Sequence, residues 1–233
     1  MNANRSFEPF RLQRRTRETD FAVLFEPRRE PGDLVKLPNR LLGHFLDHFL
    51  KACGMSLKIE NMSWPGSWRF DHVLCEDIGQ LVGCGVAEIQ DQLAVSCGVP
   101  GRANTQVCMD ESLAECTISF EGRPRIEWIV PSTDSISGLV DAWYDDAGRM
   151  IGWSMGTNLQ QFFEGFAIGS RSSVSLEIRR AGNLHHVFEA AFRALGDAVG
   201  MALGTGSAHA RIQGDKSGFA DVAEYIVERM EHN

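Results

Sequence analysis

The segment Leu184-His185-His186-Val187-Phe188-Glu189-Ala190 places two adjacent histidines shortly before a glutamate. In a helix, His185 and Glu189 lie on one face, because residues four apart are neighbours on the helix surface. His186 lies about 100° further round the axis, since an α-helix has about 3.6 residues per turn. The two imidazoles are therefore better suited to two ions, or to one ion and one hydrogen-bond partner, than to a single ion.

The first half of the chain repeats this spacing in Asp71-His72-Val73-Leu74-Cys75-Glu76-Asp77, where His72 and Glu76 are again four apart. Both copies precede a stretch with the apolar periodicity of a helix. A single His-x-x-x-Glu is typical of an ordinary surface helix. A repeated pair of imidazole and carboxylate groups, which suits Mn, Fe or Zn, favours a metal site.

Composition and charge exclude several classes of protein. The 233 residues form one large domain or two small ones, and 43% are hydrophobic, enough for a sizeable core. A net charge of −8 argues against a general nucleic-acid binder. No apolar run is long enough to cross a bilayer, and the Arg-rich N-terminus lacks the apolar segment of a secretory signal. The six cysteines contain no Cys-x-x-Cys pair, so we expect free thiols in a reducing cytoplasm.

Alternation and periodicity predict the elements of the chain. Strands are expected at residues 21–25, 56–60 and 173–178 and within 207–218, and helices at 41–53, 76–90, 159–168, 185–203 and 219–230. Two strands at 107–120 and 126–130 are expected to form a hairpin joined at residues 121–124. Residues 131–158 are polar and glycine-rich and carry no readable pattern. Helices packed on a mostly antiparallel sheet indicate the α+β class.

The chain also has an internal duplication. Each half runs helix, strand, connection, His-x-x-x-Glu and helix. His44-Phe45-Leu46-Asp47 opens the first unit, and Gln161-Phe162-Phe163-Glu164 takes the equivalent place in the second. We expect four segments: an irregular lead-in at 1–12, half-repeats at 13–130 and 131–218, and a C-terminal helical extension at 219–233.

A series of stretches resembles imidazoleglycerol-phosphate dehydratase, a family of histidine biosynthesis, in the family's order and over about residues 12–218. The stretches lie at residues 15–19, 44–47, 72–79, 109–114, 122–124 and 185–193. The resemblance implies a duplicated α+β unit of ribosomal protein S5 domain 2-like architecture. It also implies trimers that assemble into a large cubic shell, and two manganese ions between subunits that bind the imidazole ring of a small phosphorylated substrate.

The resemblance assigns roles position by position. The implied metal ligands are His44, His72, Glu76, His185, His186 and Glu189. Glu18 matches the acid/base glutamate, and Asp110 matches the aspartate of a Met-Asp-Glu motif. Basic groups make charge-assisted hydrogen bonds to a phosphate. The groups implied for this task are Arg102, Arg123, Arg193, which stands where the family commonly has lysine, and Lys216.

The chain departs from the family pattern at chemically important positions. Val73 replaces a ligand histidine and cannot bind a metal, and Gln161 replaces another and is a poor ligand. The family's arginine after the 76–90 helix corresponds to Gly101, with Arg102 one place away, and a serine before the phosphate lysine is missing. His48, one turn after His44, is available to replace a lost ligand. We expect a metal-dependent hydro-lyase with a weakened site; a non-catalytic relative that binds a phosphorylated or imidazole ligand and a single-metal enzyme with another substrate stay open.

Overall fold

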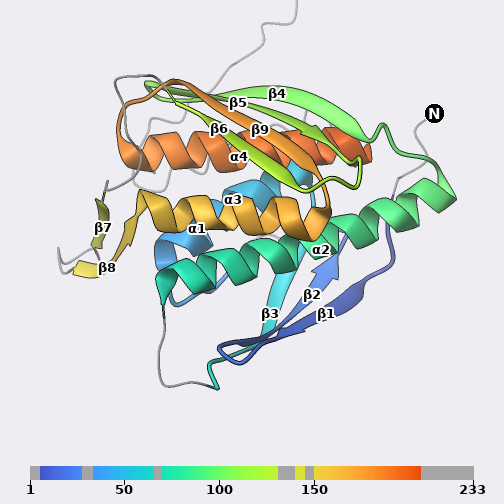
Figure 1. The fold of residues 1–233 in the computed structure, drawn as a ribbon, viewed down its shortest axis with the longest axis horizontal. Coiled ribbons are helices and arrows are strands. Elements are labelled where there is room, and N and C mark those ends of the chain that lie inside the picture. The colour runs from blue at the N-terminus through green and yellow to red at the C-terminus, as the bar shows by residue number, and fades with distance from the viewer. Residues whose placement is uncertain (1–5, 28–33, 66–69, 131–139, 145–149, 206–233) are drawn as a thin grey trace, which may run out of the picture.

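The computed structural model of the protein describes residues 6–27, 34–65, 70–130, 140–144 and 150–205 (Figure 1). The predictions for Lys216, for a strand within 207–218 and for a helix at 219–230 lie outside these ranges. None of the described helices is both long and apolar enough to span a membrane.

The first half contains one three-stranded antiparallel sheet and two helices. The strands β1 (Phe10–Arg15), β2 (Asp20–Glu26) and β3 (Ser56–Ser63) lie in that order. Helices α1 (Arg40–Cys53) and α2 (Asp71–Ser96) complete this half. The expected irregular lead-in is partly wrong, because β1 begins at Phe10 and pairs with β2 over its whole length. Helix α2 is longer at both ends than the predicted helix at 76–90.

The remaining described residues, from 102 to 205, contain a four-stranded sheet in the order β4-β5-β9-β6. Its elements are β4 (Arg102–Met109), β5 (Ser112–Ser119), β6 (Arg125–Ile129), α3 (Gly156–Ser170), β9 (Ser173–Arg180) and α4 (Leu184–Leu203). A two-stranded ribbon, β7 (Val140–Tyr144) with β8 (Met150–Met155), lies in the segment for which the sequence showed no pattern. The predicted border between the two half-repeats, at residues 130 and 131, falls between β6 and β9 in the chain. These two strands are neighbours in the four-stranded sheet, so both half-repeats contribute strands to it.

The predicted hairpin at 121–124 is wrong. Strands β4 and β5 pair antiparallel with Met109 opposite Ser112, so the hairpin turn is Asp110-Glu111. Strand β6 instead runs parallel to β9. Asp110 has a φ of 47°, a left-handed conformation that aspartate tolerates in two-residue turns. The sequence analysis did not predict this turn, because no glycine or proline interrupts the alternation of apolar and polar residues there.

The four helices lie between the two sheets (Figure 1). Helix α1 packs along α4, and α2 packs along α3. Phenylalanines fill the centre: Phe45 stacks on Phe192 with ring centroids 5.4 Å apart, and Phe162 lies 4.7 Å from Phe192. These buried rings from α1, α3 and α4 hold the three helices together and so fix the relative position of α1 and α4.

Candidate metal and active site

The two helices that carry most candidate ligands both begin at an asparagine cap. The Asn39 side chain accepts a hydrogen bond from the Leu42 backbone at 3.0 Å, and the Asn183 side chain accepts one from the His185 backbone at 2.8 Å. Such a cap satisfies an N–H that has no partner inside the helix. The cap at Asn183 therefore fixes the first turn of α4, in which both histidines lie.

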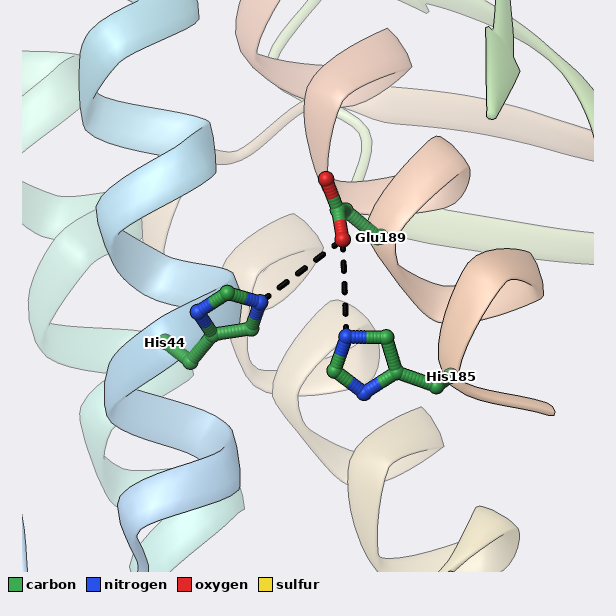
Figure 2. Close-up of side chains that lie close together, drawn as sticks. All are labelled: His44, His185 and Glu189. Carbon is green, nitrogen blue, oxygen red and sulfur yellow. Dashed lines mark ion pairs between the residues drawn. The ribbon is translucent and has the colours of Figure 1, made fainter. Parts of the chain in front are cut away.

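His44, His185 and Glu189 form what we call the inner group (Figure 2). His44 comes from α1, whereas the other two come from α4. Nε2 of His44 lies 3.6 Å and Nε2 of His185 lies 3.5 Å from Oε2 of Glu189. The three ligand atoms lie within 4.8 Å of one another, and the two imidazole rings are stacked with centroids 5.1 Å apart. Two imidazoles and a carboxylate so close together are a donor set that suits a divalent transition metal.

The carboxylate of Glu189 is buried and ionised. Burial alone would raise the pKa of Glu189, but hydrogen bonds from His185 and His44 and the charge of Arg193 outweigh it and lower the pKa. Burial lowers the pKa of His48 to about 3, so its ring is neutral. The inner group therefore presents its carboxylate in the charged form that a metal ion requires.

Arg193 lies behind the inner group, one helical turn after Glu189. Its Nη2 is 2.9 Å from Oε1 of Glu189, its Nε donates a hydrogen bond to Nδ1 of His48 at 3.1 Å, and its Nη1 contacts Sδ of Met109 at 3.5 Å. The resemblance implies a phosphate-binding role for Arg193, and the sequence did not predict that its guanidinium would contact both His48 and Glu189.

Asp110, Glu111 and His186 form an outer group at the β4–β5 turn. Nε2 of His186 lies 3.5 Å from Oδ2 of Asp110, and its Nδ1 lies 3.1 Å from Oε2 of Glu111. The pKa of Glu111 is lowered to about 2. The largest cause is the hydrogen bond that its carboxylate accepts from the backbone of Asn183, and hydrogen bonds from its own backbone and from His186 contribute as well. The sequence reasoning missed Glu111, although it belongs to the same Met-Asp-Glu motif as Asp110. The adjacent histidines of α4 thus enter two different groups.

Glu18, His72 and Glu76 lie elsewhere. Glu18 is exposed in the turn between β1 and β2, and its backbone N–H donates to Thr16 Oγ1 at 3.0 Å. His72 is exposed on the first turn of α2 beside Phe70, and Glu76 accepts a hydrogen bond from Gln80 at 3.1 Å. Among the described residues, neither metal-ligand group includes any of these three side chains.

The turn that carries Glu18 is nevertheless fixed to the helix that carries His72 and Glu76. The buried carboxylate of Asp77 on α2 accepts a hydrogen bond from the Thr19 hydroxyl and lies 2.8 Å from Nη1 of Arg14. A buried carboxylate held by a charged partner and a hydroxyl resists movement, because losing either partner would leave a charge uncompensated. Glu18 therefore keeps a defined position relative to the start of α2.

The exposed arginines lie far from the outer group within one subunit. Arg102 begins β4 opposite Ser119, and Arg123 follows β5, so both lie at the end of the hairpin away from Asp110. A strand rises about 3.4 Å per residue, so the seven steps from Arg102 to Met109 span roughly 24 Å. One subunit therefore does not place these two arginines beside His186.

A pocket of about 580 Å³ opens beside His44 at the start of α1. Two cations, Lys36 and Arg40, and one buried carboxylate, Asp47, line it together with His44 and apolar side chains. The pocket gives the inner group an opening with positive charge at its wall, which suits the approach of an anionic ligand.

The imidazoleglycerol-phosphate dehydratase family model matches residues 38–199. The chain belongs to this family. It is 30% identical over 190 residues to the imidazoleglycerol-phosphate dehydratase of Anaeromyxobacter sp. (strain K), which covers 81% of this chain and 82% of the relative. It is 29% identical over 205 residues to that of Herminiimonas arsenicoxydans, covering 87% and 91%.

Solved structures agree with this assignment. The structure of IGPD from Pyrococcus furiosus in complex with (S)-C348 is similar with a TM-score of 0.60 at 25% identity, covering 82% of this chain and 93% of that one. Imidazoleglycerol-phosphate dehydratase from Staphylococcus aureus shares the fold with a TM-score of 0.62 at 24% identity, covering 86% and 100%. The α+β fold with duplicated half-domains is thereby confirmed.

Proposed function

We propose that this chain is a metal-dependent hydro-lyase that dehydrates imidazoleglycerol phosphate in histidine biosynthesis. The observation that carries the proposal is the inner group, in which two imidazoles and an ionised carboxylate converge from α1 and α4. Such a group, in a chain of this family, is best explained as part of a metal site that holds an imidazole substrate.

The proposed metal ligands are the six that the resemblance implies, and manganese is the proposed ion. The inner group fits a divalent transition metal by its donor types, with iron or zinc as alternatives. A bound ion would act as a Lewis acid that stabilises negative charge on the imidazole ring. The ring nitrogens of His44 and His185 would hold the ion from α1 and α4, with the Glu189 carboxylate between them.

Glu18 and Asp110 are the proposed acid and base. Both are exposed carboxylates at turns, so substrate can reach them. Asp110 is oriented by His186, whose Nε2 lies 3.5 Å from its Oδ2. An ionised carboxylate can take a proton from a substrate carbon, and a second carboxyl group, in its protonated form, can give a proton to the hydroxyl that departs as water.

We further propose that the site is completed between subunits of a homo-oligomer. His72 and Glu76 lie on α2, and the turn that carries Glu18 is held to that helix by Asp77, whereas the inner and outer groups lie at α4. An ion that needs ligands from both would bind where two subunits meet. Trimers that assemble into a closed shell are the proposed arrangement, which the resemblance to the family implies and which agrees with the closed symmetry of most soluble homo-oligomers.

The substrate phosphate is proposed to bind basic groups of more than one subunit. Arg193 still has N–H groups to offer, since a guanidinium carries five and its contacts with Glu189, His48 and Met109 use one on each nitrogen. Arg102 and Arg123 would come from a neighbouring subunit, because they lie far from the outer group of their own. Lys216 is the fourth proposed phosphate ligand.

The proposed compartment is the cytoplasm. All six cysteines are free thiols: Cys53, Cys75, Cys84, Cys97, Cys108 and Cys116. Free thiols persist in a reducing compartment, where disulfides are rare.

The proposal is tested by metal content and turnover together. Purified protein, loaded with Mn²⁺ and freed of excess, is assayed for ions per subunit by elemental analysis and for dehydration of imidazoleglycerol phosphate. Bound manganese with metal-dependent turnover supports the proposal. Protein that holds no metal and has no turnover is instead a non-catalytic relative.

Val73 and Gln161 favour a second candidate, a single-metal enzyme with a different substrate. Val73 lies on α2 beside His72 and offers no donor atom, and Gln161 on α3 offers only an amide. One ion per subunit, with no turnover of imidazoleglycerol phosphate, would select this candidate.

A further inference from the structure

His48 lies one turn after His44 on α1 and is a ready candidate for a substitute metal ligand. The structure shows both of its ring nitrogens already engaged by the protein. Nδ1 accepts a hydrogen bond from Nε of Arg193 at 3.1 Å, and Nε2 lies 3.4 Å from Oε1 of Glu189. The side chain is only 13% exposed, so little of the ring is open to an incoming ion.

The partner at Nδ1 determines the tautomer of His48. The Nε of arginine always carries its hydrogen and can only donate, so Nδ1 of His48 must offer a lone pair. The ring proton of a neutral imidazole then lies on Nε2, which points at the Glu189 carboxylate. With a proton on one nitrogen and a hydrogen bond on the other, this ring has no lone pair left for a metal.

The two oxygens of Glu189 face different partners. Oε1 is within 2.9 Å of Nη2 of Arg193 and 3.4 Å of Nε2 of His48, whereas Oε2 faces His44 and His185. The Arg193 guanidinium and the nearby His48 ring therefore lie against one oxygen of the carboxylate, and the other oxygen faces the inner group. Side chains that hold a metal ligand in this way commonly raise metal affinity by about 10- to 100-fold.

We propose that His48 and Arg193 are positioning residues for Glu189, and that His48 is not a metal ligand. This inference rests on the proposed function, because it assigns Oε2 of Glu189 to the ion. The inference also gives a reason for an arginine at position 193, which is to contact His48 and Glu189 at the same time. A guanidinium reaches His48 and Glu189 at once through a planar fork, which the single ammonium of a lysine does not reproduce.

The first test compares matched substitutions one helical turn apart. Free Mn²⁺ is counted by electron paramagnetic resonance during titration of wild type, His44→Gln, His48→Gln and His48→Leu. Glutamine at position 48 supplies an acceptor for Arg193 and a donor for Glu189, so His48→Gln should bind Mn²⁺ within about threefold of wild type. His48→Leu supplies neither and should weaken binding about tenfold. His44→Gln, which loses a proposed ligand, should weaken it by more.

Two results would overturn the inference. If His48→Gln weakens Mn²⁺ binding as much as His44→Gln does, His48 is a ligand. If His48→Leu binds like wild type, His48 has no positioning role. Arg193→Lys is the second variant and should weaken binding about tenfold, because its ammonium cannot hold both partners.

A second test does not need the metal, so it separates this inference from the proposed function. In excess chelator, the midpoint of thermal unfolding, Tm, is measured for His48→Leu, Arg193→Leu and the double variant. Because the two side chains are in contact, the loss in the double variant should be smaller than the sum of the single losses. Additive losses would overturn the Arg193–His48 contact. Wild type that binds no Mn²⁺, with losses that are not additive, would refute the proposed function and leave the contact supported.

Discussion

At the scale of single residues, His185 and His186 show how adjacent side chains acquire different partners. His185 faces Glu189 and His44 in the inner group, and His186 faces Asp110 and Glu111 in the outer group. The helical rotation of about 100° per residue separates them. Two metal positions on one helix turn are therefore compatible with this geometry.

His185→Ala and His186→Ala should each lower the bound manganese, and the double variant should hold almost none. Each substitution removes an imidazole from a different group, so the two losses should accumulate. Elemental analysis of ions per subunit measures the effect. Val95→Ala, a change at a 91% exposed residue on α2, is the control and should leave metal content unchanged. Unchanged metal in the double variant would refute the metal site.

The two replaced ligands should reduce catalysis. Turnover of imidazoleglycerol phosphate should be weak, because losing one positioned electrostatic group commonly costs about 100- to 1000-fold. Val73→His with Gln161→His should raise both metal content and kcat, and the pair should do more than the sum of the single changes. Steady-state kinetics with added Mn²⁺ checks this. High turnover in the unmodified protein would contradict it.

At the scale of elements, glycines determine how closely α2 and α3 approach. A Cβ added at Gly79 or Gly83 would lie 2.1 or 2.3 Å from a carbonyl oxygen of α3, and one at Gly165 or Gly169 would lie 2.2 Å from a carbonyl oxygen of α2. The obstructing atoms are backbone, so they cannot rotate away as a side chain would. This close packing positions the start of α2, and with it the proposed ligands on that helix.

Gly83→Ala should therefore destabilise the protein by about 2 kcal/mol. A clash with backbone atoms places the cost of overpacking at the upper end of its usual range of about 1–3 kcal/mol, and the gain in helix propensity from glycine to alanine offsets about 1 kcal/mol of it. Denaturant unfolding of the metal-free protein measures the change. Cys84→Ala, at the exposed neighbouring position on the same helix, is the matched control and should change stability by less than about 0.5 kcal/mol. A more stable Gly83→Ala would show that the helices can separate without cost.

At the scale of the whole molecule, the described part of one subunit holds its candidate ligands in separate places. Among the described residues of one subunit, His72 and Glu76 on α2 belong to neither of the two ligand groups at α4. A metal ion bound by ligands from both helices would connect subunits, so binding and assembly would be thermodynamically linked.

The protein should accordingly form an oligomer larger than a dimer, and removal of metal should reduce its size or its stability. Light scattering, with Mn²⁺ and after dialysis against a chelator, measures the mass. Excess Mn²⁺ restored to the chelated sample is the control for irreversible damage. A monomer under both conditions would contradict the shared site.

The sequence by itself predicted the class of the fold, most of the helices and the residue types of the site. Helices such as α1 and α4 are predictable because their periodicity and asparagine caps are local, within a few residues of the chain. The i, i+4 spacing likewise predicted the contact between His185 and Glu189, which lies within one helix.

Only the tertiary structure decided which distant residues meet. The parallel pairing of β6 with β9 depends on strand partners far apart in the chain. The same holds for Arg193, whose guanidinium reaches His48, 145 positions earlier. Spacing along a chain contains no information on such contacts, because packing of α1 against α4 brings the two residues together. The sequence thus determined which residue types are present at the site, whereas the packing of helices and sheets determined which of them are in contact.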